Sequence, residues 1–367
     1  MVKNYLKTLL LATFAMMLPL VASADVEINE ENFPDENFRS WVLAKDFGKD
    51  GVLTDEEIAG IKKINLIWYN LHSIKGIEFF TELTMLDCSG NYLTEADVSK
   101  CTKLTYFDCG QNLITDLDVS KNTALTTLGC GPNLLTTLDV SKNTALHELY
   151  CFGNKLTALD VSGNTELTIL NFKQNQLTEL DVSKNTELKV LACRNNLLTS
   201  LNASGHAKLE SIRCEGNKLT TLNVSDCPSL YEVFCCNNQI RGEAMDAFIE
   251  SLPISPRNRG FLMVADTVNE QNVMTKAQVA ATKAKGWSPC YIYGAFGEWG
   301  YPDYEGSDDT TGIDSIHNSE FIIQNSQSSM VNGQSVYDLQ GRKLSAPQKG
   351  ITIIRYSDGS SRKVLEK

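Results

Sequence analysis

Seven cysteines recur at a fixed interval in this chain, and thiols so placed could act as nucleophiles, form disulfides or bind zinc. They fill one slot of a 21-residue repeat: Cys88, Cys109, Cys130, Cys151, Cys193, Cys214 and Cys235. The one copy without cysteine holds Phe172, which can neither bind metal nor form a bridge. Zinc sites need clustered ligands at spacings such as CxxC, and the sequence has none. We therefore predict that the slot is a small apolar core position filled by buried free thiols.

Four further cysteines lie outside that slot: Cys101, Cys227, Cys236 and Cys290. Cys101 and Cys227 occupy a turn position that other copies fill with asparagine. Cys236 is expected to be exposed, and Cys290 follows the repeats. A disulfide among these four remains an open alternative in a chain expected to be exported.

Residues 46–57, DFGKDGVLTDEE, match most ligand positions of an EF-hand calcium loop. The ligands would be Asp46, Asp50, the Val52 carbonyl, Thr54 and a bidentate Glu57. Gly48 stands where the third ligand is expected, which predicts a low affinity. Thr54 and Glu57 also match a capping box for a helix beginning near Asp55. Both roles are compatible with the sequence, and calcium is the one cofactor that it predicts.

A column of aspartates recurs with the same step: Asp97, Asp118, Asp139, Asp160 and Asp181. The column could bind cations or could be a solvated face. We favour the solvated face, because lysines lie three residues further on in most copies and can offset the charge.

The sequence contains few residues or motifs that are typical of enzymes. The chain has only four histidines, and HExxH, GxSxG and glycine-rich phosphate-loop motifs are absent. The repeated thiols are expected to point inward. We therefore predict that the protein is not an enzyme.

The repeat itself must supply the elements that position these residues. Its unit, LxxLxCxxNxLTxLDVSxNTx, carries leucines and asparagines in phase from one copy to the next. One such coil cannot bury its apolar side alone, but stacked coils can. We predict an α/β solenoid of about nine coils over residues 61–240, with one short parallel strand near residues 128–130 of each coil and Asn133 turning the corner. The inward side chains should be Leu125, Leu128, Cys130, Leu135, Leu138 and Val140.

The outward strand positions predict a ligand-binding surface, because aromatic and arginine side chains are enriched in interface hot spots. Its residues would be His147, Tyr150, Phe152, Lys173, Arg194, Arg213 and Phe234. We interpret them as a basic, aromatic patch on an acidic body that would suit an acidic or sugar ligand. The net charge of −12 argues against nucleic acid as a partner.

The two ends of the chain differ from the repeats. Residues 1–24 have two lysines, an apolar run and a small-residue cleavage site, which predicts a signal peptide and export. No other stretch is apolar enough to span a membrane. We expect a helical cap at 25–60, an α/β cap at 241–302, a linker at 303–312 and a small all-β tail at 313–367.

The repeat, the entry segment INEENFPDENFRSWVLAKDFGKDGVLTDEEI and the tail VYDLQGRKLSAPQKGITIIRYSDGSSRKVLEK together resemble the exported leucine-rich-repeat proteins of Bacteroidales. The repeats resemble internalin-type solenoids more loosely. The tail is similar to C-terminal β domains used for sorting to the cell surface. The resemblance implies a secreted or surface location.

Three functions are therefore in view. The first is recognition of a protein or glycan, including adhesion, through the concave strand face. The second is a structural envelope component without a specific ligand, which the near-identical coils would also suit. The third, an enzyme, is the weakest.

Overall fold

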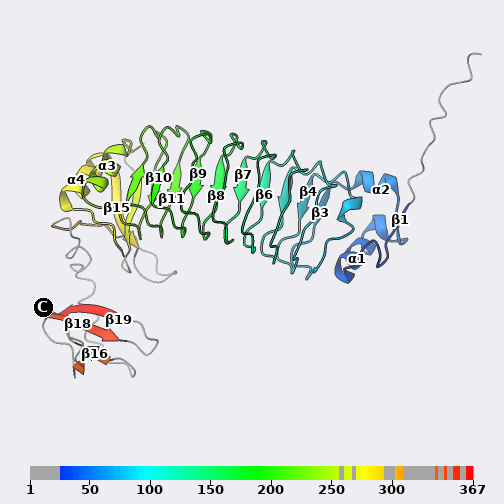
Figure 1. Cartoon of the computed structure of the whole chain (residues 1–367), viewed down its shortest axis with the longest axis horizontal. Coiled ribbons are helices and arrows are strands. Elements are labelled where there is room, and N and C mark those ends of the chain that lie inside the picture. Colours follow the sequence, from blue (N-terminus) through cyan, green and yellow to red (C-terminus); the bar gives the residue numbers. More distant parts are fainter. Residues whose placement is uncertain are drawn as a thin grey trace, which may run out of the picture.

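The computed structural model describes residues 25–255, 260–266, 270–292 and 302–308, together with the backbone of 335–337, 343–344, 350–355 and 361–366. The predicted signal peptide lies outside the described residues. Figure 1 shows a row of stacked coils with a helical element at the N-terminal end and a mixed α/β element at the other.

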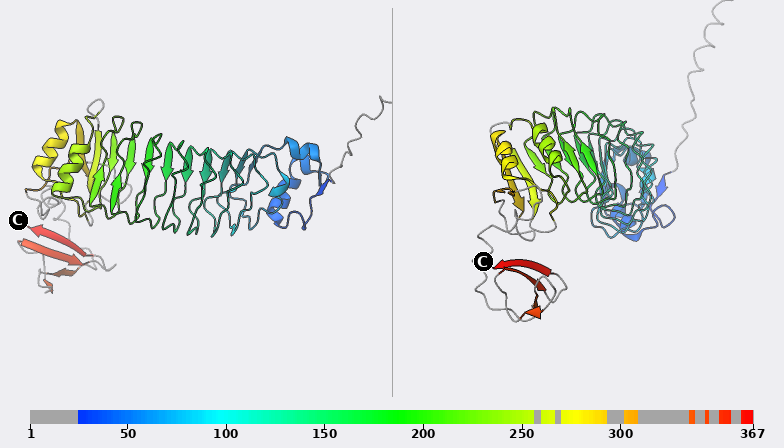
Figure 2. Two further views of the ribbon diagram at one scale, coloured as in Figure 1. Left: turned by 45° about the horizontal axis from the view of Figure 1, so that its top comes forward. Right: turned by 60° about the vertical axis from the view of Figure 1, so that its left-hand side comes forward.

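One sheet of eleven parallel strands runs the length of the solenoid, and its strands lie along one side of the coils (Figure 2). Nine strands come from the repeats: β3 (Lys63–Asn65), β4 (Met85–Asp87), β5 (Tyr106–Asp108), β6 (Thr127–Gly129), β7 (Glu148–Tyr150), β8 (Ile169–Asn171), β9 (Val190–Ala192), β11 (Ser211–Arg213) and β13 (Glu232–Phe234). Successive strands pair at a step of 21 residues, except that Ile64 pairs with Leu86 at 22. The predicted solenoid is confirmed, with each strand beginning one residue earlier than expected.

The coils share one continuous apolar core. All six side chains predicted to point inward in the coil of Cys130 are buried, with Leu138 the most accessible at 8%. Each repeat strand buries its central residue, and β5, β7, β8 and β13 leave both flanking residues partly open, as around Leu149 in β7. The core therefore has the layered form that stacked coils require, in which each coil contacts only its neighbours.

All eleven cysteines are buried and free. Burial raises the pKa of the Cys151 thiol to about 12 and those of Cys109 and Cys130 well above their ordinary value. The predicted apolar role of the repeated thiols is confirmed, and no disulfide joins Cys101, Cys227, Cys236 or Cys290. The expectation that Cys236 is exposed is wrong, because it packs against Met263 and Cys290 from strands that follow the repeats.

Buried asparagines close the corner after each strand, as predicted for Asn133. In the coil of Asn154, Nδ2 donates to the carbonyl oxygens of Cys151 and Cys130, both at 3.1 Å, and Oδ1 accepts from Leu135 N at 3.0 Å. Each side chain thus links its own coil to the preceding one. We call this set the asparagine ladder: Asn91, Asn112, Asn133, Asn154, Asn175, Asn196, Asn217 and Asn238. Asn272 extends it beyond the repeats by donating to Cys235 O and accepting from Ile240 N.

A second row of buried donors lies at the other corner of the coil. Asn143 Nδ2 donates to Val119 O at 2.9 Å and to Asn122 O at 3.0 Å. Cys101 and Cys227 take the same place and bring their Sγ atoms to a carbonyl one coil earlier, at 3.4 and 3.0 Å. This explains why a thiol is tolerated where other copies have asparagine: the position needs one donor inside a dry corner.

An aromatic plug covers the N-terminal end of the core. The cap comprises β1 (Val26–Glu27), α1 (Glu36–Leu43), η1 (Asp46–Gly48), β2 (Val52–Leu53), α2 (Asp55–Gly60) and η2 (Ile77–Phe79). Phe33 lies 5.6 Å from Phe38 and 6.4 Å from Phe80, measured between ring centroids. The capping role that solenoid ends require is thus filled by these rings.

The C-terminal cap continues the same sheet. After α3 (Glu243–Ser251), β14 (Gly260–Asp266) pairs in parallel with β13, and α4 (Lys276–Ala284) leads to β15 (Trp287–Ile292) beside it. The linker expected at 303–312 is wrong for its described part. Tyr304 is buried, its backbone N–H donates to Pro289 O, and Ser307 N donates to Met274 O, so the segment packs on the cap.

The tail contains an antiparallel sheet in the order β17-β16-β18-β19. Its strands are β16 (Ser335–Tyr337), β17 (Lys343–Leu344), β18 (Gly350–Arg355) and β19 (Ser361–Glu366). The described residues of the tail therefore form β-strands, in agreement with the expected all-β tail.

Candidate functional site

The seven predicted surface residues lie along the open side of the parallel sheet, which we call the strand face. Tyr150, Arg213 and Phe234 end strands β7, β11 and β13. Strand pairing places Tyr150 and Arg213 in one row that runs Tyr150, Asn171, Ala192, Arg213, Phe234, Met263. Phe152, Lys173 and Arg194 lie two residues beyond the ends of β7, β8 and β9, and His147 just precedes β7. The structure therefore brings the predicted residues onto one face.

Cations stack on aromatic rings within this face. Lys173 Nζ lies 4.8 Å from the ring centroid of Phe152, in the preceding coil. The Arg213 guanidinium lies 4.8 Å from the ring centroid of Phe234, in the next coil. Each pair spans two coils, and such contacts orient both side chains. Two clusters result, one around Tyr150, Phe152 and Lys173 and one around Arg213 and Phe234.

The interpretation of this surface as a basic patch is wrong, because its two arginines pair with glutamates on the same face. Arg213 Nη2 lies 3.2 Å from Glu232 Oε2, and Arg194 Nη1 lies 3.7 Å from Glu215 Oε1. Burial raises the pKa of Glu215, against the opposing effect of Arg194. The face is therefore aromatic with matched charges, and an acidic ligand is not required by its electrostatics.

Sequence reasoning missed the contribution of the C-terminal cap to this face. Phe261 and Met263 in β14 pair with Glu232 and Phe234, and the Phe234 and Phe261 ring centroids are 5.5 Å apart. The 21-residue step ends before β14, so the repeat could not place them. The strand-like segment GFLMVAD carried the only signal. His147 lies at the margin of the strand face. Its ring is exposed, and its Nδ1 lies 2.8 Å from the carbonyl oxygen of Ala145, outside the two clusters.

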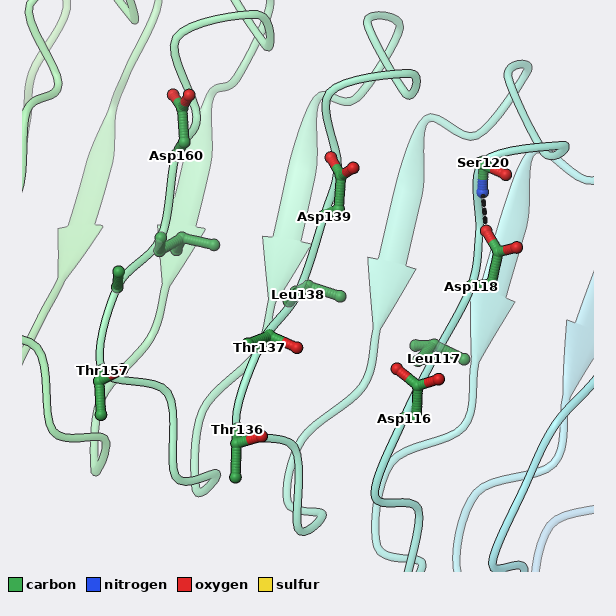
Figure 3. Close-up of a pocket in the computed structure, with 12 residues that line it drawn as sticks. Asp116, Leu117, Asp118, Ser120, Thr136, Thr137, Leu138, Asp139, Thr157 and Asp160 are labelled. Atoms are coloured by element: carbon green, nitrogen blue, oxygen red, sulfur yellow. Dashed lines mark hydrogen bonds between the residues drawn. The ribbon is translucent and has the colours of Figure 1, made fainter.

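The aspartate column lies on the side of the coils opposite the strands, which we call the outer face. Here Asp118, Asp139 and Asp160 line a groove of about 430 Å³ (Figure 3). Each aspartate of the column accepts a hydrogen bond at 2.8–2.9 Å from the backbone N–H of the serine two residues on, as Asp118 does from Ser120. These bonds lower the pKa values of Asp118, Asp139, Asp160 and Asp181. The column is thus a series of turns. The serine N–H groups stabilise the charged carboxylates more than do the lysines that we expected to offset the charge.

The last two full coils support this assignment. They carry Asn202 and Asn223 in place of aspartate, and these accept the same serine N–H bonds at 3.2 and 3.0 Å. The adjoining segments pair there as β10 (Ser200–Asn202) and β12 (Thr221–Asn223). Among the described residues, outer-face strands form only in this pair, where a neutral amide removes the repulsion between like charges in neighbouring coils.

The metal ligands predicted in residues 46–57 are held by other protein groups. Glu57 Oε2 accepts from Thr54 N at 2.9 Å and Thr54 Oγ1 at 2.8 Å, and Glu57 N donates to Thr54 Oγ1, which is the capping box of α2. Asp46 pairs with Lys49 at 3.0 Å on an exposed surface, and Asp50 accepts from Val52 N. The described residues contain no group of three or more acidic, histidine or cysteine side chains able to hold a metal ion. In this arrangement Glu57 Oε2 serves the capping box of α2, and calcium binding by these residues stays a prediction.

The chain shows limited similarity to known proteins. Residues 61–122 match the family model for leucine rich repeats (2 copies), and no curated protein matches. Among solved structures, the functional domain of InlJ from Listeria monocytogenes is 20% identical, with a TM-score of 0.31, and the match covers 94% of this chain and 99% of that one. Internalin C2 from the same species is 20% identical at a TM-score of 0.46, with coverages of 59% and 90%. The ectodomain of the receptor kinase GASSHO1/SCHENGEN3 from Arabidopsis thaliana is 19% identical at 0.49, with coverages of 64% and 30%.

Replacing Asp118, Asp139 and Asp160 together by asparagine tests the role of the aspartate column. Asparagine keeps the turn but carries no charge, so we expect the melting temperature at pH 7 to stay within about 3 °C of the parent. Because their folded-state pKa values are lowered, the aspartates stabilise the fold above their unfolded pKa values and lose that effect as the pH falls. The triple variant should therefore lose less stability than the parent on acidification from pH 7. A rise in melting temperature with calcium or magnesium that only the parent shows would instead establish a cation site.

Glu57→Gln separates the two roles proposed for that residue. Glutamine serves a capping box as glutamate does but is a poor calcium ligand, so we expect the melting temperature in EGTA to fall by no more than about 2 °C. Thermal unfolding with and without millimolar calcium provides the measurement. A calcium-dependent rise in the parent that is lost in Glu57→Gln would establish the calcium loop, whereas equal behaviour of the two proteins would leave capping as the role of Glu57.

No described helix has the length and apolar character needed to cross a bilayer. The repeat register, the parallel sheet and the match of residues 61–122 identify the fold of this chain as a leucine-rich-repeat solenoid.

Proposed function

We propose that this protein is an exported, non-enzymatic recognition module that binds a protein or glycan ligand through its strand face. Solenoids present long surfaces of this kind, and function in them resides in the side chains that the surface displays. The lysines and apolar run of residues 1–24 support export, and the sorting-like tail supports a surface location.

The observation that carries the proposal is a contrast between two exposed sides of the same coils. On the outer face the turn that follows each aspartate hardly changes over residues 97–186, since DVSKNT recurs at 118, 139 and 181. On the strand face the residue ending the strand varies widely among the coils: Asp87, Asp108, Gly129, Tyr150, Asn171, Ala192, Arg213 and Phe234. Exposure alone does not explain this difference, because Tyr150, Asn171, Arg213 and Phe234 are at least partly accessible, as the outer-face turns are. A surface that varies along a constant frame is what selective recognition requires.

Aromatic side chains supply the anchors of that surface. Tyr150 and Phe152 are half-buried, and their positions are set by Glu148, which accepts from Tyr150 Oη at 3.1 Å, and by the overlying Lys173. Side chains held in this way lose little conformational entropy when a ligand binds. We therefore place the centre of the contact at the cluster of Tyr150, Phe152 and Lys173.

The test replaces Tyr150, Phe152 and Lys173 together by alanine. Binding of the mature chain to protein and glycan arrays, followed by titration of each hit, should fall at least tenfold in this variant because it removes two aromatic anchors. The matched control is Lys142→Ala with Lys184→Ala, exposed lysines of the outer face, which should bind as the parent does.

Unchanged binding by the triple variant would move the site away from the strand face. The absence of any ligand on either array would favour the structural envelope alternative. Catalytic turnover of a ligand that one substitution abolishes would contradict the non-enzymatic assignment.

A further inference from the structure

Exposed apolar side chains gather at the loops that follow the first strands. Of the eight large hydrophobic side chains exposed among the described residues, four lie here: Trp68 at 66%, Tyr92 at 50%, Leu113 at 46% and Tyr69 at 43%. With His72 they form a set that we call the aromatic edge. It lies beyond the strand ends, apart from the strand-face residues described above. Clustered exposed rings of this kind mark binding surfaces.

Trp68 occupies a backbone position that the fold does not favour for it. Its φ is 60°, in the left-handed region. The same slot is left-handed in seven of the eight later coils, which hold Gly90, Gln111, Gly153, Gln174, Asn195, Gly216 and Asn237, and the eighth holds Pro132. A bulky aromatic residue is strained there, whereas glycine is not. Turn geometry therefore does not account for the tryptophan, and strain of this type accompanies functional surfaces.

The indole ring is seated on the backbone of the next coil. A Cβ atom at Gly90 would lie 2.5 Å from Cδ2 of Trp68, so the ring rests against the space that the glycine leaves. Gly90 is buried, while Trp68 remains two-thirds exposed. One face of the ring is thus supported and the other is open to solvent.

The rest of the aromatic edge is held equally firmly. His72 and Tyr92 stack with ring centroids 5.3 Å apart and an interplanar angle of 17°. Asp35 joins the loop to the N-terminal cap, because its Oδ2 accepts from His72 N at 2.7 Å and Ser73 N at 3.1 Å while its Oδ1 caps α1. Asn37 Nδ2 donates to Asn70 O at 3.2 Å. The rings are therefore presented by a preorganised loop, which lowers the entropic cost of binding.

The exposed amides beside these rings are neutral, and the nearby carboxylates of Asp35 and Asp87 already accept hydrogen bonds from His72 N, Ser73 N and Ser89. Asn70 and Gln111 place exposed amides beside the edge, and Ser89 lies next to Trp68, whose N–H donates to Ser89 O. Aromatic faces pack well against the C–H faces of sugar rings, and amides exchange hydrogen bonds with hydroxyls. We propose that the aromatic edge is a binding site for a neutral polysaccharide, with sugar rings stacked on Trp68 and Tyr92.

Affinity electrophoresis of the mature chain through native gels containing glucomannan, xylan, mixed-linkage β-glucan or dextran tests the proposal. Trp68→Gly places in the slot the residue that other coils use, and Tyr92→Gln places the residue found at Gln176 and Gln239. Both variants should therefore fold normally. We expect at least one of these polymers to retard the parent, and either substitution to lower the apparent affinity at least tenfold. Leu197→Gln removes an exposed side chain from the slot of Tyr92 five coils away and should change nothing.

Retardation that persists when Trp68→Gly and Tyr92→Gln are combined would overturn the proposal, as would the absence of retardation by all four polymers. Retardation that depends on Tyr150, Phe152 and Lys173 would assign the sugar to the strand face instead. Because the two sets of variants do not overlap, failure of this site and failure of the strand-face proposal are distinguishable.

Discussion

The asparagine ladder is the interaction on which the rest of this structure depends. A coil of 21 residues must turn sharply at its corners, and a tight corner leaves backbone N–H and C=O groups facing an apolar interior. Each ladder amide satisfies three such groups at once, two carbonyls and one N–H, and does so across two coils. The side chain therefore closes its own coil and fixes its register against the preceding one, and buried groups of this kind are costly to leave unpaired.

Closing the corner so tightly also explains the thiols and the division of the surface. The slot three residues before each ladder asparagine faces the dry interior, and cysteine fills it in seven coils as an apolar residue with a buried sulfur. Residues that serve the core or the turns are nearly invariant between coils, including the outer-face aspartates. The strand face and the aromatic edge serve neither the core nor the turns, so their composition can vary without disturbing the coil. In the function that we propose, recognition is thereby separated from folding in the same short repeat.

The sequence predicted the structure of the repeated coils correctly, and its wrong predictions concern contacts with residues outside the repeats. Period and side-chain type located the strands, the inward leucines and the role of Asn133, because each is a local consequence of stacking identical coils. Cys236 was misplaced because its cover comes from β14 and β15, which lie outside the 21-residue step. The linker expected at 303–312 followed composition, yet the burial of Tyr304 depends on a distant partner strand.

Among the functional candidates, the sequence placed the strand-face residues together but not their charge balance, since pairing of Arg194 with Glu215 depends on side-chain geometry. Trp68 escaped notice because its significance lies in a left-handed φ that the sequence does not display. Sequence patterns thus located surfaces, whereas contacts between coils determined their chemistry.

The free energy of unfolding of Asn154→Ala, measured by urea titration against Asn171→Ala, tests the central claim most directly. Asn171 lies in the middle of the same sheet but on the half-exposed strand face. The ladder account predicts a loss of roughly 2–4 kcal/mol for Asn154→Ala, because buried backbone groups lose their partner, and less than about 1 kcal/mol for Asn171→Ala. Equal and small losses in the two variants would contradict it.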